Sequence, residues 1–135
     1  MAVRILGSAK IVQAKEIGRI TNQNNSKGVK RTKSFDKKLA KADSEGTKIL
    51  LIHNHPAGMP PSPADVNELF KLKNAVGITV GHDGSIYKYT KPKTVIDSKD
   101  WYVSMCHYSG FSEKTAQEKT MQLLSKKYVF TVEEL

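Results

Sequence analysis

An uninterrupted apolar run near the middle of the chain constrains the fold more than any other feature. Residues 49–52 read Ile-Leu-Leu-Ile, without a polar residue among them. Such a continuous run is typical of a strand that is buried on both faces, whereas a strand with one solvated face alternates. The run follows a segment with helical periodicity and precedes a loop rich in proline and glycine. We therefore expect a buried central strand.

The segment before this strand has the spacing of a short amphipathic helix. Phe35, Leu39 and Ala42 recur at positions i, i+4 and i+7, which places them on one helical face. Ser34 is the expected N-cap, and Gly46 stands just past the expected end.

The rest of the chain alternates between expected strands and helices, which predicts a layered α/β domain with helices packed on a sheet. Asp83-Gly84 is typical of a hairpin turn, and a polar loop is expected over residues 22–28. Strands are expected over residues 3–6, 11–21, 76–80, 85–89 and 128–132, and helices over residues 63–73 and after N-caps at Ser98 and Ser112.

Composition narrows the class of protein. The 135 residues suit one domain, and 39% of them are hydrophobic, as in ordinary globular proteins. No apolar stretch has the length of a membrane span. The single cysteine, Cys106, excludes an internal disulfide and a thiolate-rich zinc site. We expect a reducing, cytoplasmic setting.

Positive charge is concentrated in the first third of the chain. Lys and Arg number 22 against 13 Asp and Glu, for a net charge of +9. Residues 1–48 hold 12 of the basic and 4 of the acidic side chains. Two interpretations stay open: a surface for nucleic acid or another acidic partner, and a solvated face that keeps the protein soluble.

The residues with the clearest chemistry follow the central apolar run. His53 and His55 are two positions apart at the end of the expected strand, so both imidazoles face the same side. Asp65 falls in the first turn of the next expected helix, from which its carboxylate can reach back over the strand end. Two histidines and one carboxylate suit zinc, with a fourth position left for water.

A purely structural interpretation of part of this segment is also available. Ser62 is a good N-cap, and Pro63 suits the first helical position. The negative charge of Asp65 interacts favourably with the dipole at the helix N-terminus. The two interpretations are compatible, because a capped helix end can also present a ligand. The joint order of apolar strand, HNHP, proline-rich loop and SPAD favours the functional one.

This order resembles the JAMM (MPN, or JAB) zinc metallopeptidase motif, in which HxHP is followed by a short loop and SxxD. HNHP with a glycine two residues later is closest to the RadC-like branch. The run from HNHPAGMPPSPADVNEL into GHDGSIYKYTKP is similar to JAB-type domains of some phage head-morphogenesis proteins. The resemblance covers residues 10–92.

The resemblance implies a cytidine-deaminase-like α/β fold, with a central mixed sheet flanked by helices. Residues 1–92 are then the metallopeptidase core, and residues 93–135 a mainly helical C-terminal extension packed on that core.

The resemblance also implies a role for each motif residue. His53, His55 and Asp65 match the three Zn²⁺ ligands, and Ser62 matches the serine that stabilises the oxyanion. Six residues separate His55 from Ser62, where seven are usual. The shorter loop is expected to shift the Ser62 hydroxyl relative to the metal, whereas Asp65 can still bind it.

The motif further requires an upstream glutamate that activates the attacking water. Glu16 lies in a strand-like segment and is the expected base, whereas Glu45 lies in a turn before the central strand. Glu68 lies one helical turn after Asp65. Its carboxylate could hold one of the metal ligands in place without binding the metal, or it could be an exposed helix residue.

The implied activity is zinc-dependent hydrolysis of an amide or isopeptide bond in a protein or peptide substrate. Two other functions stay open: a metal-free MPN-like scaffold for protein interaction, of the kind used in phage head assembly, and a basic nucleic-acid-binding module. The sequence indicates no membrane partner and leaves the oligomeric state open.

Overall fold

The structure is a computed structural model that describes residues 33–55 and 58–135 and the backbone of residues 3–6 and 16–20. In these residues six strands form one mixed sheet in the order β2-β1-β3-β4-β5-β6. β2, β1, β3 and β4 run parallel to one another, whereas β5 is antiparallel to both of its neighbours, β4 and β6. The strands are β1 (Val3–Leu6), β2 (Glu16–Ile20), β3 (Lys48–His55), β4 (Ala75–Gly81), β5 (Ile86–Thr90) and β6 (Val132–Glu134).

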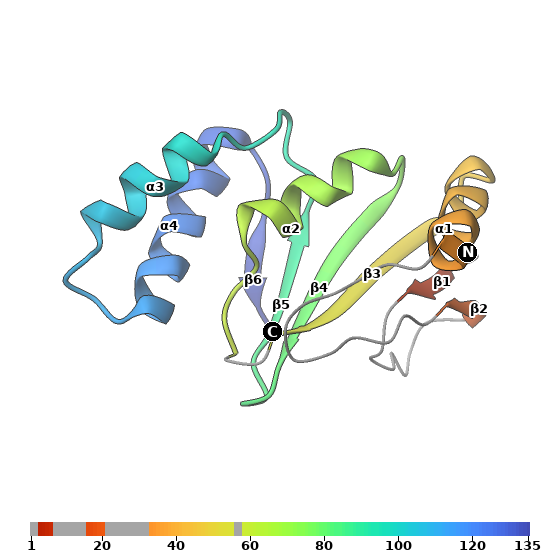
Figure 1. Ribbon diagram of the computed structural model, residues 1–135, viewed down its shortest axis with the longest axis horizontal. Helices are drawn as coiled ribbons and strands as arrows, with labels where there is room; N and C mark the ends of the chain where they lie inside the picture. Colours follow the sequence, from red (N-terminus) through yellow and green to blue (C-terminus); the bar gives the residue numbers. More distant parts are fainter. Residues whose placement is uncertain (1–2, 7–15, 21–32, 56–57) are drawn as a thin grey trace.

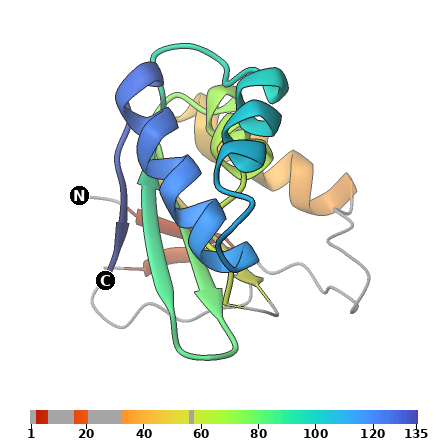
Figure 2. The same cartoon turned by 90° about the vertical axis from the view of Figure 1, so that its left-hand side faces the viewer.

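The helices lie along the sheet, with α2 over its middle, α1 toward one end and α3 and α4 side by side at the other (Figure 1, Figure 2). They are α1 (Lys33–Ser44), α2 (Pro63–Glu68), α3 (Ser98–His107) and α4 (Glu113–Tyr128), and a 3-10 turn, η1 (Leu69–Lys71), continues α2. The α/β fold with a mixed sheet and helices is therefore confirmed. No helix in the described ranges is long and apolar enough to cross a membrane.

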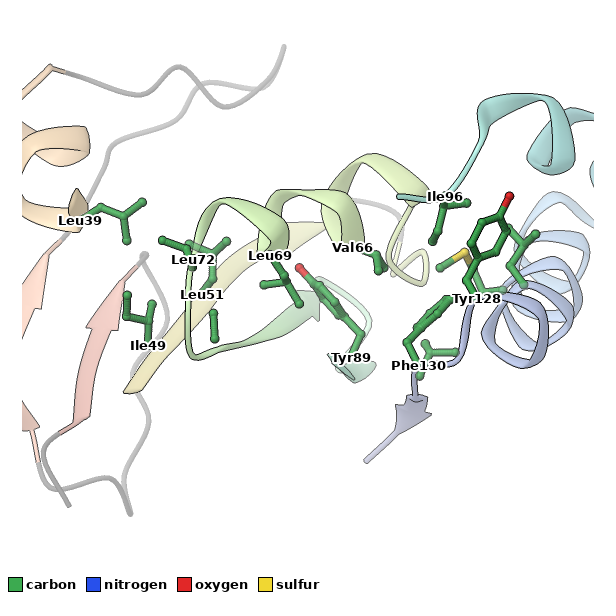
Figure 3. Packing of buried hydrophobic residues seen from close by; sticks show 14 of the residues in the cluster. Leu39, Ile49, Leu51, Val66, Leu69, Leu72, Tyr89, Ile96, Tyr128 and Phe130 are labelled. Carbon is green, nitrogen blue, oxygen red and sulfur yellow. The ribbon is translucent and has the colours of Figure 1, made fainter. Parts of the chain in front are cut away.

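One apolar cluster joins the helices to the sheet. Ile49 and Leu51 of β3 are buried beneath α2 and η1, whose Val66 and Leu69 are fully buried. Tyr89 of β5 lies on the opposite side of the same cluster (Figure 3). Along β4 burial alternates residue by residue, as expected for a strand with one covered face. The central strand expected from the apolar run is thus β3, which lies between β1 and β4.

The structure corrects two of the expected helix boundaries. α1 buries Phe35, Leu39 and Ala42 as predicted, but it begins at Lys33, so Ser34 lies inside the helix and is not its N-cap. The sequence predicts that the second helix continues to residue 73, but after Glu68 it tightens into η1 and ends at the C-cap Leu72, whose backbone is extended. Leu69 and Leu72 are both buried, so the helix ends where the chain turns into the core.

The C-terminal elements differ from the prediction in two further places. α3 has Asp97 as its N-cap, not Ser98, because the Asp97 side chain accepts the Lys99 N–H. The last strand begins at Val132 and not at residue 128, because Tyr128 ends α4 and Val129 turns the chain with a left-handed φ of 55°. The N-cap of α4 is Ser112, as predicted.

Several expectations are left open by the structure. The polar loop over residues 22–28 and the first part of the strand expected over residues 11–21 lie outside the described residues. The C-terminal elements are joined to the rest of the described structure, because β6 pairs with β5 and α4 contributes to the same apolar cluster as α1 and α2. The division of the chain at residue 92 stays a prediction.

Candidate metal centre

Both candidate histidines lie at the carboxyl end of β3. In an extended strand alternate residues share a face, so His53 and His55 continue the helix-covered face begun by Ile49 and Leu51. The side chains of His53 and His55 are only 19% and 17% exposed, so solvent reaches the two imidazoles without surrounding them.

The third candidate ligand is supplied by the first turn of α2. Ser62 is the N-cap of this helix, and its Oγ accepts the Asp65 N–H at 3.3 Å. The Asp65 carboxylate returns the interaction, because its Oδ2 accepts the Ser62 N–H at 2.8 Å. This reciprocal capping box fixes the direction of the Asp65 side chain. It turns that side chain toward the end of β3.

The three side chains converge on one point. Asp65 Oδ1 lies 3.3 Å from Nε2 of His53, and Asp65 Oδ2 lies 3.3 Å from Nε2 of His55. The two Nε2 atoms are 2.8 Å apart. Ligand atoms about 2.0–2.1 Å from a tetrahedral zinc ion lie about 3.3 Å from one another. The two histidine-to-carboxylate distances match this value, and the two nitrogens lie somewhat closer, so His53, His55 and Asp65 form a group that could hold a metal ion.

A second hydrogen bond orients the His55 ring. Its Nδ1 lies 2.8 Å from the carbonyl oxygen of Met59, an acceptor, so Nδ1 carries the proton and donates it. The remaining nitrogen, Nε2, faces Asp65 and His53 and is the atom free to bind a metal ion. A histidine whose other ring nitrogen donates to a backbone carbonyl is the usual arrangement of a metal ligand.

The electrostatic environment of the candidate metal centre favours the negatively charged form of Asp65 and the positively charged form of His55. Burial by itself would raise the pKa of Asp65, but hydrogen bonds and charge from the histidines hold it well below its usual range. Burial lowers the pKa of His55, and the contacts with Asp65 and Met59 outweigh it, so the net pKa is raised. Asp65 is thus an ionised carboxylate, the form in which it can bind a cation.

A small cavity of about 110 Å³ opens beside His53 and Asp65. Its apolar wall comes from Phe35, Leu51, Ile52 and Tyr89, and the carboxylate-bearing Glu68 stands on the same lining. The cavity joins α1, β3, α2 and β5 at the candidate metal centre.

The floor of this region is a buried tyrosine. Tyr89 is fully buried, and its hydroxyl has no hydrogen-bond partner among the described residues. Burial, with the nearby charges of Asp65 and Glu68, raises the pKa of Tyr89 well above its usual value. Tyr89 therefore remains a neutral phenol beneath the cavity.

The backbone register separates the predicted base from the three candidate ligands. Glu16 begins β2 and pairs with Val3, which on its other side pairs with Lys48 at the start of β3. His53 is five residues further along β3, or about 16 Å at 3.3 Å per residue. The side chain of Glu16 lies outside the described part of the chain, so its role stays a prediction.

The structure thus brings together four of the five predicted site residues, namely His53, His55, Asp65 and Ser62. The histidine pair and the SxxD helix start were the signals that located them. Glu68 is the residue whose place at the cavity the sequence left undecided, because its spacing from Asp65 fits both a site residue and an exposed one.

Comparisons of this chain with protein-family models, with curated proteins and with solved structures find no match. The structure establishes an α/β fold with a mixed β-sheet, and a His-His-Asp group at the end of β3 and the start of α2 that could hold a metal ion.

Proposed function

We propose that this protein is a zinc-dependent peptidase or isopeptidase of the JAMM type, which uses water to hydrolyse an amide bond in a protein or peptide. One observation carries the proposal: His53, His55 and Asp65 converge with zinc-like spacing at a partly exposed strand end. The order of HNHP and SPAD in the sequence adds the chemical class.

Three protein ligands leave a tetrahedral ion with one open position, which distinguishes a catalytic from a structural site. When bound, such an ion supplies a Lewis acid that polarises the scissile carbonyl and makes water a better nucleophile. The chain's part is to hold the three ligand atoms in place, with Asp65 fixed by its capping box and His55 by Met59.

Ser62 has a second role in this proposal. As an N-cap its hydroxyl oxygen accepts the Asp65 N–H, which leaves the hydroxyl proton available. That proton can be donated to the oxyanion that develops on the substrate, which is the role implied by the resemblance.

Two glutamates compete for the role of general base. The resemblance implies Glu16, whereas the cavity beside the ligands offers Glu68. The two assignments differ in a simple experiment: Glu16→Gln and Glu68→Gln should both retain zinc, and the one that removes the base should lose at least about 100-fold in kcat. Full activity in both variants would exclude both residues as the base.

Metal content is the first test of the proposed function. We expect about one zinc ion per purified chain, and none in the His53→Ala/His55→Ala variant. The loaded protein should then be assayed on a library of peptide and isopeptide substrates. No bound metal after zinc is added back would instead support a metal-free scaffold.

A second candidate function, nucleic-acid binding, is favoured by the exposed face of α1. Lys33, Lys37, Lys38 and Lys41 are all exposed on this one helix. Contacts of lysine with phosphate weaken steeply as salt is raised. Salt-dependent DNA or RNA binding that is lost in a Lys37→Glu/Lys38→Glu/Lys41→Glu variant would support this function, and its absence would leave α1 as a solvated face.

A further inference from the structure

We infer that α4, far from the motif in the sequence, is the positioning element of the metal centre, with Gln117 and Lys114 as its positioning residues. The inference rests on the proposed metal site. It deepens that proposal by assigning a role to a helix that the resemblance does not cover.

Gln117 reaches from α4 to the loop that follows His55. Its Nε2 donates a hydrogen bond to the Pro60 carbonyl at 2.8 Å, and this bond is buried although the partners are 57 positions apart. A buried carbonyl that loses its donor is left unsatisfied, which is unfavourable. The bond therefore ties the loop to α4 at one defined point.

This point is next to the group that orients a metal ligand. The carbonyl of Met59 accepts the His55 Nδ1–H, and Pro60 is the following residue. A movement of Pro60 away from Gln117 would thus turn the His55 ring that faces Asp65.

Lys114 supports the same loop through a second contact. Its Nζ lies 3.2 Å from Asp83 Oδ2, in the turn between β4 and β5. The Asp83 carboxylate lies so close over Gly58 that a Cβ added there would fall 2.3 Å from its oxygens. Gly58 in turn donates its N–H to the His55 carbonyl at 3.2 Å.

Two side chains one helical turn apart on α4 therefore reach this loop: Gln117 bonds Pro60 directly, and Lys114 bonds Asp83, whose carboxylate lies over Gly58. A preorganised ligand set loses less conformational entropy when the metal binds, so these contacts should raise metal affinity.

The test uses Co²⁺ as the probe, because its visible absorption reports both affinity and coordination geometry. Gln117→Met removes the donor while keeping an unbranched side chain of similar length. We expect Co²⁺ binding to weaken about tenfold, as for other outer contacts of metal ligands. The visible bands should also change in intensity, because the ligand geometry changes.

Gln122→Met is the matched control. Gln122 is on the same helix and also donates its side-chain amide to a backbone carbonyl, that of Val132 at 3.2 Å, but not in the metal-site loop. We expect its Co²⁺ affinity within about twofold of the unsubstituted protein, with an unchanged spectrum. Equal effects of the two substitutions, or none from Gln117→Met, would overturn the inference.

A second pair of variants removes exposed ion pairs of α4, so its result does not depend on a buried contact whose loss could unfold the protein. Lys114→Met removes the contact with Asp83, and Lys127→Met removes an equivalent α4 contact with Asp100 at 2.7 Å in α3. Only Lys114→Met should change the Co²⁺ spectrum, and no difference between the two would count against the inference. An unsubstituted protein that binds no Co²⁺ would refute the proposed function as well, so the two failures are distinguishable.

Discussion

Two helices of this protein begin in the same way and use that beginning differently. α2 starts after Ser62 and α4 after Ser112, and each serine hydroxyl accepts the N–H three residues on at 3.3 Å. In α4 that third residue is Thr115, whose hydroxyl only contacts Ser112, at 3.0 Å and in an exposed position. In α2 it is Asp65, whose carboxylate also faces two histidines.

The difference shows how a local stabilising motif becomes part of a site. A cap fixes the backbone and the third side chain, whatever that side chain is. At α4 the fixed group faces solvent, whereas at α2 the end of β3 stands opposite and places His53 and His55 within 3.3 Å. The possible metal-binding role of α2 therefore comes from the two histidines that its capped Asp65 faces, and not from the cap itself.

The strongest test of this comparison replaces the third residue of each helix. Asp65→Ala removes one of three proposed ligands, and we expect zinc affinity to fall by more than about 100-fold, beyond the loss from removing an outer contact. Thr115→Ala removes an exposed hydroxyl and should leave zinc affinity unchanged and the free energy of unfolding within about 0.5 kcal/mol. Chelator competition measures the affinities. Similar zinc affinities for the two variants would mean that Asp65 serves only as a cap.

Added metal should stabilise the folded protein, because only the folded chain brings the three ligands together. Zinc at 100 times its dissociation constant should raise the free energy of unfolding by about 2.7 kcal/mol. Thermal unfolding with zinc and with chelator measures this difference. The Asp65→Ala protein serves as the control and should unfold at the same temperature in both. A shift of equal size in that variant would indicate metal binding elsewhere.

The candidate ligands were predictable because their interactions are local in sequence. Two histidines on one strand face and a capped aspartate ten residues later are fixed by strand alternation and by helix capping, so they can be read residue by residue. The same local rules found the buried face of α1 and the cap at Ser112. They failed at Ser98, because Asp97 competes for the same cap and nothing in the sequence ranks the two.

The support of the loop was not predictable for the opposite reason. The bond from Gln117 to Pro60 joins residues 57 positions apart, and Gln117 has no motif around it. The place of Glu16 is likewise a matter of strand register, which pairs it through Val3 with the far end of β3. Contacts of this kind depend on the whole topology.

A glycine comparison tests the same loop with a smaller effect. Gly58 and Gly46 both have left-handed backbone, with φ of 62° and 69°, but a Cβ at Gly46 would meet no atom within 4 Å. Gly46→Ala should therefore cost about 1 kcal/mol of unfolding free energy and leave metal binding intact.

Gly58→Ala should cost more, about 2 kcal/mol or above, because the new methyl group also collides with Asp83. Urea unfolding measures both variants, and Co²⁺ titration should show weaker binding for Gly58→Ala alone. Adding Asp83→Ala should restore part of the lost stability. Equal costs at the two glycines would show that Asp83 does not press on the loop.

The smallest expected effect distinguishes the contribution of the Ser62 hydroxyl to helix stability from its contribution to metal binding. Ser62→Ala and Ser112→Ala each remove one hydroxyl acceptor, and each should lower the free energy of unfolding by about 1 kcal/mol. Ser62→Ala should nevertheless keep its metal within about threefold, because the Ser62 backbone N–H still donates to Asp65 at 2.8 Å. Urea unfolding and Co²⁺ titration of both variants measure this. If Ser62→Ala lost its metal, the hydroxyl rather than the backbone would be what directs Asp65 toward the histidines, and the two helix starts would differ in their caps as well as in their surroundings.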